Sequence, residues 1–390
     1  MTRRRGAFGV LLVLVLLLAA CLLAAPALVE RHYNEVVPRP RASPSARALA
    51  LHRRLTIVDL HADSLLWGRD LLDRSPRGHV DVPRLVEGNV AIEAFTVVTK
   101  TPRGLNITRN DDRTDMITPL ALVQRWPPRT WGSLRERALY LAGRLDAAAR
   151  RSDGRLTVLR TRDDVGRYLE RRRRAPETTA GVLGLEGAHA LEGDLAAVDA
   201  LFDAGFRMMA PTHFFDTDWA GSAHGVAKGG LTAKGRALVR RLEERRVLLD
   251  LAHASPRTIA DALAMATRPV VVSHGGVKGT CPSERTLSDE HVRAIAAGGG
   301  VIGIGYWETA VCGREPRQVV AAIKHVVSLV GDDHVGLGSD YDGATTVGFD
   351  TSQLAALTQQ MQGDGLSEAQ IRKVLGGNVV RVLRAVLPER

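Results

Sequence analysis

From Leu55 onward, short runs of Val, Ile, Leu and Ala alternate with longer amphipathic segments along the chain. The short runs are continuously apolar, which is typical of parallel strands that are buried on both faces. Eight strand–helix units in about 330 residues predict an α/β fold of the (β/α)8 TIM-like barrel type. The eight predicted strands are Thr56–His61, Ala91–Val98, Gly181–Glu186, Arg207–Thr212, Val247–His253, Pro269–His274, Val301–Tyr306 and Val335–Asp340.

The segments between the predicted strands have helical patterns, with aliphatic residues at three- and four-residue spacing. Examples are Ala233–Arg245, Pro256–Ala266, Asp289–Ala297 and Pro316–Val330. The segment from Lys100 to Ala180 is too long for one crossover, so we expect a helical insertion after the second strand. A doubly wound open sheet is the alternative fold. Such sheets usually carry a Gly-rich phosphate-binding turn after the first strand, where this chain has His61, Ala62 and Asp63.

The first 29 residues have the pattern of a membrane-targeting segment. Arg3, Arg4 and Arg5 precede an almost uninterrupted apolar run from Ala7 to Val29, which is long enough to act as an uncleaved signal anchor. Two alternatives are a lipoprotein signal, in which Cys21 is lipidated, and a secretory peptide that is cut near Ala25. All three place the body of the chain outside the cytoplasm. We therefore predict a signal anchor or lipoprotein signal at residues 1–29, a linker at 30–50 and one barrel domain at 51–390.

The formal net charge of the chain is +10, from 53 Lys and Arg against 43 Asp and Glu. A positive balance accompanies nucleic-acid binding in some proteins. Here the excess is arginine spread over the predicted helix faces, with short clusters such as Arg171–Arg174. No zinc-finger spacing, RNA-binding aromatic signature or basic-zipper heptad accompanies it, so we expect no nucleic-acid partner.

Side chains that bind metals or transfer protons stand at six of the eight predicted strand ends. Barrel enzymes place their reacting groups at the C-terminal ends of the strands, so these side chains should converge on one mouth. Many buried polar groups in one place need a shared partner. Imidazole and carboxylate without thiolate fit two Zn²⁺ ions. The residues are His61, Asp63, Glu186, His213, His253, His274 and Asp340.

The spacing divides five of these residues between two metal ions. His61 and Asp63 are two residues apart, so on a strand they face the same side and suit one ion. His253 and His274 are the last residues of neighbouring predicted strands and suit the second ion. Glu186 lies between the two pairs in strand order, so its two carboxylate oxygens can bridge both ions.

Two metal ions about 3.5–4 Å apart would hold a bridging hydroxide and polarise a carbonyl group. Asp340 has no ligand role in this scheme, so we expect it to transfer a proton. Asp342 is the alternative for that role, but Asp340 is the last residue of a predicted strand. The residues therefore predict a hydrolase that uses water activated by two metals.

The same motifs resemble those of the renal or membrane dipeptidases, a family of binuclear zinc peptidases with an amidohydrolase-like barrel. The resemblance implies hydrolysis of dipeptides, including those with a D-residue at the second position. It also implies that His213 stabilises the oxyanion and that Arg285 binds the C-terminal carboxylate of the substrate. The resemblance covers about Leu55 to Leu387 and rests on Asp59–Trp67, Gly184–Gly187, Thr212 and His213, Asp218–Ala220, Gly230–Gly235, Asp250–His253, Val272–His274, Cys281 with Arg285 and Asp289, Gly338–Gly343 and Gly376–Asn378.

Some properties stay open at this stage. The segment Tyr306–Thr309 does not identify a substrate-binding tyrosine, and Gly221–His224 stands where the family more often has an acidic or amide residue. The oligomeric state is also open, with a homodimer as one expectation. Another binuclear amidohydrolase reaction, such as lactone or N-acyl amino acid hydrolysis, is the alternative activity. A non-catalytic anchored binding protein is the alternative class, and the complete ligand set with Asp340 argues against it.

Cys281 and Cys312 are the only cysteines of the predicted barrel. They lie in consecutive strand–helix loops, and neighbouring strands are about 4.8 Å apart, so the loops approach within bridging reach. The predicted export places them in an oxidising compartment, and the family resemblance implies the same pairing. We therefore predict a Cys281–Cys312 disulfide, with two free thiols as the alternative.

Overall fold

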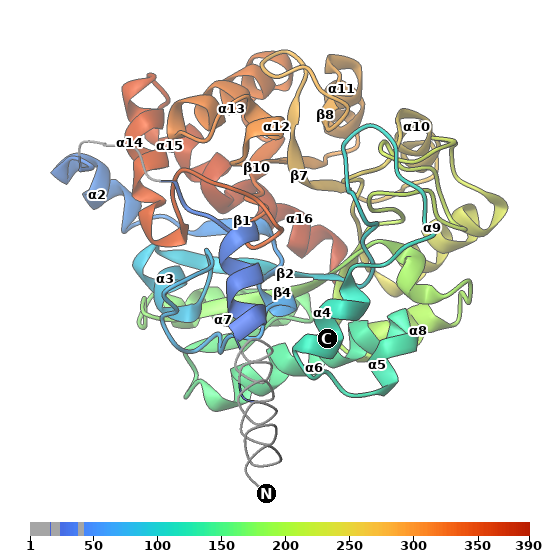
Figure 1. Ribbon diagram of the computed structural model, residues 1–390. Coiled ribbons are helices and arrows are strands. Elements are labelled where there is room, and N and C mark those ends of the chain that lie inside the picture. Colours follow the sequence, from blue (N-terminus) through green and yellow to red (C-terminus); the bar gives the residue numbers. More distant parts are fainter. Residues whose placement is uncertain (1–15, 17–23, 38–42) are drawn as a thin grey trace, which may run out of the picture.

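The computed structural model describes residue 16, residues 24–37 and residues 43–390. In this part of the chain a parallel sheet forms the centre of the molecule and helices surround it (Figure 1). The hydrogen-bonded strand order is β6-β5-β4-β2-β1-β10-β9-β7-β8, and β3 pairs with β4 outside this path. The strands are β1 (Ile57–Ala62), β2 (Val90–Val98), β3 (Leu156–Val158), β4 (Thr179–Glu186), β5 (Phe206–Met209), β6 (Leu248–Leu249), β7 (Val271–Val277), β8 (Thr286–Leu287), β9 (Val301–Ile304) and β10 (Val335–Leu337).

Each of the eight predicted apolar runs contains a strand of this sheet, and the pairings between the strands are parallel. The short strands β3 and β8 are additions that the apolar pattern does not predict. A parallel bridge between Asp250 and Val271 connects the end of β6 with β7, supported by a hydrogen bond of 2.7 Å from Leu251 N to Val271 O. The predicted α/β class with a parallel sheet is confirmed.

Several strands end earlier than the apolar runs predict. β5 ends at Met209, β6 at Leu249 and β10 at Leu337, three or four residues before the predicted ends. His253 and Asp340, four and three residues after the ends of β6 and β10, have φ angles of 60° and 59°. This left-handed backbone is incompatible with a strand. Both side chains therefore lie on loops directly beyond the sheet.

Three helices have the bounds that the sequence pattern predicts, because their start signals are local. The side chains of Thr232 and Ser288 cap α9 and α11 by accepting hydrogen bonds from backbone N–H groups, and Pro316 is the first residue of α13. The predicted insertion between β2 and β4 holds α4 to α7. The helices are α2 (Ala46–His52), α3 (Val82–Glu87), α4 (Ile117–Val123), α5 (Arg129–Gly132), α6 (Leu134–Arg151), α7 (Arg162–Arg172), α8 (Ala197–Asp203), α9 (Ala233–Arg245), α10 (Pro256–Leu263), α11 (Asp289–Ala297), α12 (Glu308–Val311), α13 (Pro316–Val330), α14 (Ala355–Gly363), α15 (Glu368–Arg372) and α16 (Asn378–Val386).

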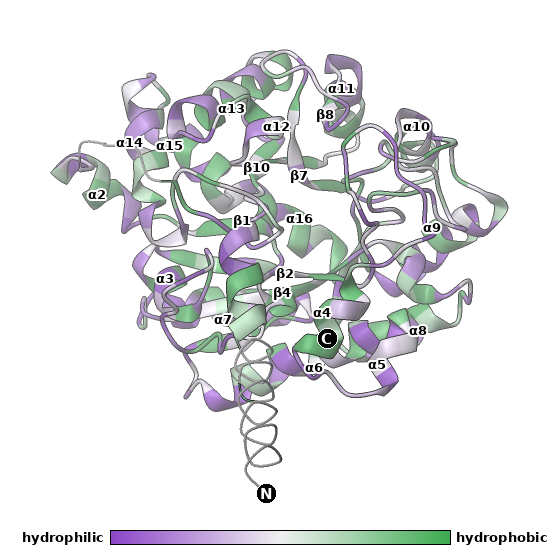
Figure 2. Ribbon diagram, in the orientation of Figure 1, coloured by the Kyte–Doolittle hydropathy of each residue, from purple (hydrophilic) through white to green (hydrophobic). Residues whose placement is uncertain are grey.

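The central strands of the sheet are buried along their whole length. Every residue of β1, β2, β4 and β7 is buried, because helices cover the sheet. Figure 2 shows the central strands mainly in hydrophobic colours, whereas the surrounding helices carry hydrophilic stretches as well. A fully buried sheet fixes the direction of its strand ends, so polar groups at those ends are held in place by the core.

Most of the predicted targeting segment, including Arg3 to Arg5 and Cys21, lies outside the described residues. Among the helices that the structure describes, none is long and apolar enough to cross a membrane. Residues 24–33 are helical, and the chain after this helix contacts the main domain. Val36 forms a parallel bridge with Val347, beyond the end of β10. We call Glu30–Val37 the N-terminal docking segment; it forms the first part of the predicted linker.

Candidate active site with a metal centre

The seven predicted metal-binding and proton-transfer residues come together at the C-terminal ends of the parallel strands. Three lie on strands β1, β4 and β7, and four lie on the loops that follow β1, β5, β6 and β10. None is more than 8% exposed. Burial of so many polar side chains in one cluster is costly unless a common partner compensates it. The set comprises His61, Asp63, Glu186, His213, His253, His274 and Asp340.

Glu186 lies at the centre of this cluster. Its Oε1 atom is 2.9 Å from Nε2 of His253 and 3.3 Å from Nε2 of His274. Its Oε2 atom is 3.5 Å from Nε2 of His61, which is 3.6 Å from Oδ1 of Asp63. The two oxygens of one carboxylate therefore face two separate groups of side chains.

These distances fit metal ligands. Tetrahedral zinc binds nitrogen and oxygen at about 2.0–2.2 Å, so neighbouring ligand atoms lie roughly 3.3–3.6 Å apart. The spacings around His61 agree with this value, and the Nε2 atoms of His253 and His274 are 3.1 Å apart. Nε2 of His61 and Oε1 of Glu186 are buried and have no hydrogen-bond partner within the described chain. Atoms of this kind are satisfied by a bound cation.

The structure also brings two further residues within ligand distance. The atoms that could bind a metal form three groups, each within 4.8 Å: one joins His61, Glu186 and His274, a second joins Glu186 with His213 and His253, and a third joins His61 with Asp63 and Asp340. Distance alone therefore does not separate ligands from the residues predicted to act on the substrate. That assignment stays a prediction.

Burial and neighbouring charges set the protonation of the ligand groups. Burial lowers the pKa of His253 and of His274 well below the ordinary histidine value, and positive charge on Arg285 adds to both shifts. These imidazoles are therefore neutral at pH 7, which is the form that binds metals. Burial opposes the ionisation of Glu186, but His213 and His61 outweigh it and hold the pKa of this carboxyl well below its usual range. Glu186 is consequently an anion.

Several residues that the sequence analysis did not identify orient these side chains. Ser273 lies between two of the histidines, with its Oγ atom 3.2 Å from Nδ1 of His61 and 2.9 Å from Nδ1 of His274. Thr96, on β2, donates a hydrogen bond of 2.6 Å to Oδ1 of Asp63. Such contacts fix the ring orientation of metal ligands. Serine and threonine inside apolar strands give little signal in a single sequence.

Asp340 lies beside the first group, with Oδ1 3.9 Å from Nε2 of His61. Burial raises the pKa of Asp340 well above the ordinary carboxyl value, and Glu186 adds to this shift. A Cβ atom on Gly343 would lie 2.0 Å from Oδ1 of Asp340 and 3.1 Å from Oδ2 of Asp63. Only glycine therefore fits at position 343, where the loop passes directly over both carboxylates.

Arg285 extends into the cluster from the loop after β7. Its Nη2 atom donates a hydrogen bond of 2.9 Å to the carbonyl of His274 and is 3.3 Å from Nε2 of His253. The side chain is buried, and its Nη2 atom contacts an imidazole and a backbone carbonyl rather than a carboxylate. A buried cation of this kind is suited to an anionic group of a ligand.

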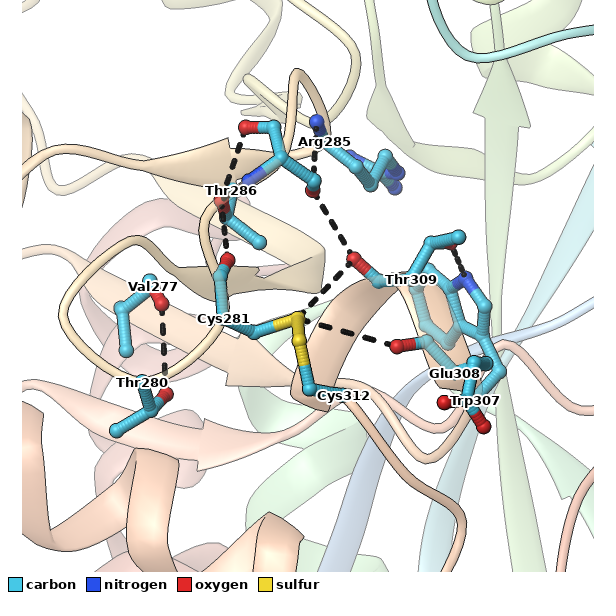
Figure 3. The surroundings of a disulfide bond; sticks show 10 residues. Val277, Thr280, Cys281, Arg285, Thr286, Trp307, Glu308, Thr309 and Cys312 are labelled. Atoms are coloured by element: carbon cyan, nitrogen blue, oxygen red, sulfur yellow. Dashed lines mark hydrogen bonds between the residues drawn. A yellow bond between two sulfur atoms is a disulfide. The ribbon is translucent and has the colours of Figure 1, made fainter.

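The disulfide between Cys281 and Cys312 is present and confirms the predicted pairing. It joins the loops after β7 and β9, with a Cα–Cα distance of 5.3 Å (Figure 3). From these loops, the hydroxyl of Ser283 donates to the carbonyl of Thr309 at 3.0 Å, and the same hydroxyl accepts the backbone N–H of Arg285 at 3.2 Å. The bridge therefore restrains the loop that carries Arg285.

A cavity of about 290 Å³ adjoins the cluster of seven polar side chains, and both His253 and Arg285 line it. Leu251, Ile259 and Val272 contribute an apolar part of its wall. The cavity therefore combines an apolar wall with the cationic side chain of Arg285.

A family model and individual relatives both match this chain, and they point to the same family. The family described as "Membrane dipeptidase (Peptidase family M19)" matches residues 45–388. Dipeptidase tcpJ of Claviceps purpurea is 29% identical over 325 residues, which cover 79% of this chain and 69% of that protein. An uncharacterised protein of the pqqA 5′ region of Klebsiella pneumoniae is 29% identical over 250 residues, covering 60% of this chain and 90% of that protein.

Solved structures agree with the sequence relatives. A family M19 metallopeptidase, dipeptidase AC, has a TM-score of 0.70 and 25% identity, covering 85% of this chain and 99% of its own. A metallopeptidase of Rhodobacter sphaeroides, solved with a phosphinate mimic of the dipeptide L-Ala-D-Ala, has a TM-score of 0.69, 25% identity and the same coverage. The family resemblance noted in the sequence is thereby confirmed. The chain belongs to the membrane dipeptidase family, peptidase family M19, and is a metallo-dipeptidase.

Proposed function

We propose that this dipeptidase holds two Zn²⁺ ions and cleaves dipeptides that include a C-terminal D-residue. The observation that carries the proposal is the position of Glu186, whose Oε1 and Oε2 atoms face separate ligand groups. His61 and Asp63 would hold one ion, His253 and His274 would hold the other, and Glu186 would bridge them. When bound, the ions polarise the scissile carbonyl and activate the attacking water or hydroxide.

The remaining site residues act on the substrate in this proposal. Burial raises the pKa of Asp340, which makes its carboxylate form a stronger base, so this group can take a proton from the attacking water and pass it to the leaving amine. Nε2 of His213 lies 3.6 Å from Oε1 of Glu186, close to where an oxyanion would form, and would donate a hydrogen bond to it. Arg285 would pair with the C-terminal carboxylate, and the adjoining cavity would receive the side chain of the second residue.

The D-residue part of the proposal is supported by the Rhodobacter sphaeroides relative, which was solved with a mimic of L-Ala-D-Ala. The proposed closure of the sheet into a barrel is supported by the parallel bridge between Asp250 and Val271. This bridge joins the end of β6 to β7, the first and last strands of the eight-strand path β6-β5-β4-β2-β1-β10-β9-β7.

We further propose that the enzyme is exported and attached to the membrane by residues 1–29. The support is the charge and hydropathy pattern of this segment.

Purified protein loaded with excess zinc and then desalted is expected to contain two metal ions per chain, measured by elemental analysis. Glu186→Gln is expected to contain fewer than two, because a neutral amide replaces the anionic bridge. Arg150→Ala, which removes an exposed cation on α6, serves as the control and should keep both ions. A native protein that holds one ion or none after loading would contradict the two-metal proposal.

The metal-loaded enzyme is expected to hydrolyse L-Ala-L-Ala and L-Ala-D-Ala, and a chelator should abolish both activities. N-acetyl-alanine and a simple lactone serve as comparison substrates for the alternative amidohydrolase reactions. Because Arg285 is a buried cation, an uncharged lactone should be a poor substrate. Liberated amino acids are measured by chromatography. Turnover of the lactone without turnover of either dipeptide would reject the dipeptide proposal.

A further inference from the structure

The N-terminal docking segment lies against the loop that carries Asp340. Val37 N donates a hydrogen bond of 2.8 Å to the carbonyl of Val347, and Val347 N donates one of 2.9 Å to the carbonyl of Glu35. Asn34 is buried, and its Oδ1 atom accepts the backbone N–H of Ala344 at 2.9 Å. The segment precedes residue 45, where the family match begins. Its contacts are therefore additional to the part of the chain that the family match covers.

A line of buried charges connects the same segment to the loop. Glu30 is 1% exposed, and its two carboxylate oxygens accept hydrogen bonds of 2.6 Å from Nε of Arg69 and Nε of Arg77. Arg69 also donates to Oδ2 of Asp342 through Nη2. Asp342 in turn accepts a hydrogen bond of 2.6 Å from the hydroxyl of Ser64, the neighbour of a proposed metal ligand. Breaking a buried network of this kind leaves uncompensated charge, so its members hold one another in position.

The loop needs such support because its backbone is strained. Asp340, Asp342 and Ala344 have φ angles of 59°, 61° and 59°. Left-handed backbone costs free energy at residues other than glycine and persists only where the surroundings enforce it. Two of the three strained residues are held from the N-terminal docking segment, Ala344 directly by Asn34 and Asp342 through Arg69.

We propose that the side chains of Glu30 and Asn34 are positioning groups for the loop that carries Asp340, so that these two residues of the N-terminal docking segment support the active site. The inference rests on the proposed role of Asp340 in proton transfer. The segment fixes the backbone at Asp342 and Ala344, and this places the Asp340 carboxyl over the metal ligands. The effect of losing the segment is therefore on turnover rather than on metal or substrate binding.

Full-length Glu30→Gln tests this inference, with Glu35→Gln as its matched control. Both changes remove one negative charge from the docking segment, but the Glu35 side chain is exposed and only its backbone carbonyl contacts Val347. Glu30→Gln should lower kcat by at least about tenfold, since misplacement of a catalytic group by about 1 Å costs on the order of 10²-fold. Its KM and its content of two metal ions should stay unchanged, and Glu35→Gln should match the native enzyme in all three.

Asn34 provides the second arm. Asn34→Ala should lower kcat in the same way. Asn34→Asp should keep the native kcat, because a carboxylate oxygen can also accept the Ala344 N–H. Hydrogen exchange gives a readout that does not depend on activity: amides 343–347 should exchange faster in Glu30→Gln and in Asn34→Ala, while amides of the central strands should not change. If the native enzyme cleaves no dipeptide, the proposed function fails, and the exchange result still decides the positioning role. A lowered melting temperature with native kcat and native exchange at 343–347 would overturn the inference.

Discussion

Asp340→Asn is expected to lower kcat by at least about 10²-fold while two metal ions remain bound. Asparagine keeps the shape of the side chain but cannot accept and release the proton that the proposed reaction moves. The buried carboxyl is well suited to this task because its pKa is raised by burial well above the ordinary value. Turnover of L-Ala-D-Ala and elemental analysis of the same sample give the two measurements.

The control for this substitution is Asp73→Asn, which removes an exposed carboxylate that does not belong to the cluster. It should leave turnover and metal content unchanged. Loss of a metal ion in Asp340→Asn would show that Asp340 is a ligand, as its grouping with His61 and Asp63 also permits. Unchanged turnover with two ions bound would assign the proton transfer to another group.

Amidation of the C-terminus of a dipeptide is expected to lower kcat/KM by at least about tenfold, on the order of 1.4 kcal/mol of transition-state stabilisation. The reason is that Nη2 of the buried Arg285 contacts an imidazole and a backbone carbonyl, so a neutral amide leaves the guanidinium without a direct anionic partner. Arg285→Ala should erase the difference between the free and the amidated dipeptide. The comparison needs only initial rates for L-Ala-L-Ala and its amide with both enzymes.

Arg150→Ala again serves as the control, because it removes an arginine from the outer surface of α6. This variant should discriminate between the two substrates as the native enzyme does. Equal turnover of the free and the amidated dipeptide by the native enzyme would show that Arg285 does not bind the C-terminal carboxylate of the substrate.

The alternation of apolar runs and amphipathic segments was sufficient to predict every strand except β3 and β8, together with several helices. The start of α11 follows from the cap at Ser288, and that of α13 from Pro316, which are local signals. The early ends of β6 and β10, and the left-handed backbone of His253 and Asp340 beyond them, were not predictable. That conformation is imposed by contacts of the loops and leaves no mark on hydropathy.

The candidate site likewise contains residues that the sequence identifies and residues that it does not. His61 and Asp63 were identifiable because their residue types are rare in apolar strands and their spacing has a geometric meaning. Ser273 and Thr96 were not identified, because their hydrogen bonds to the ligands join positions that are distant in sequence. The predicted disulfide could be read from the sequence because the barrel holds just one pair of cysteines. The buried network from Glu30 to Asp342 spans 312 positions and has no such short-range signal.

This network also determines where the cooperative folding unit begins. The family match starts at residue 45 and the predicted barrel domain at residue 51, yet Glu30 is as buried as the core of the sheet. A polypeptide that began at either boundary would leave Arg77 without its acidic partner and Arg69 with Asp342 alone. Proteolytic removal of the chain before Glu30 would spare these contacts, whereas a cut a few residues later would expose a charged interior surface. Two cuts only a few residues apart, about one turn of helix, would therefore differ in whether this buried network stays intact.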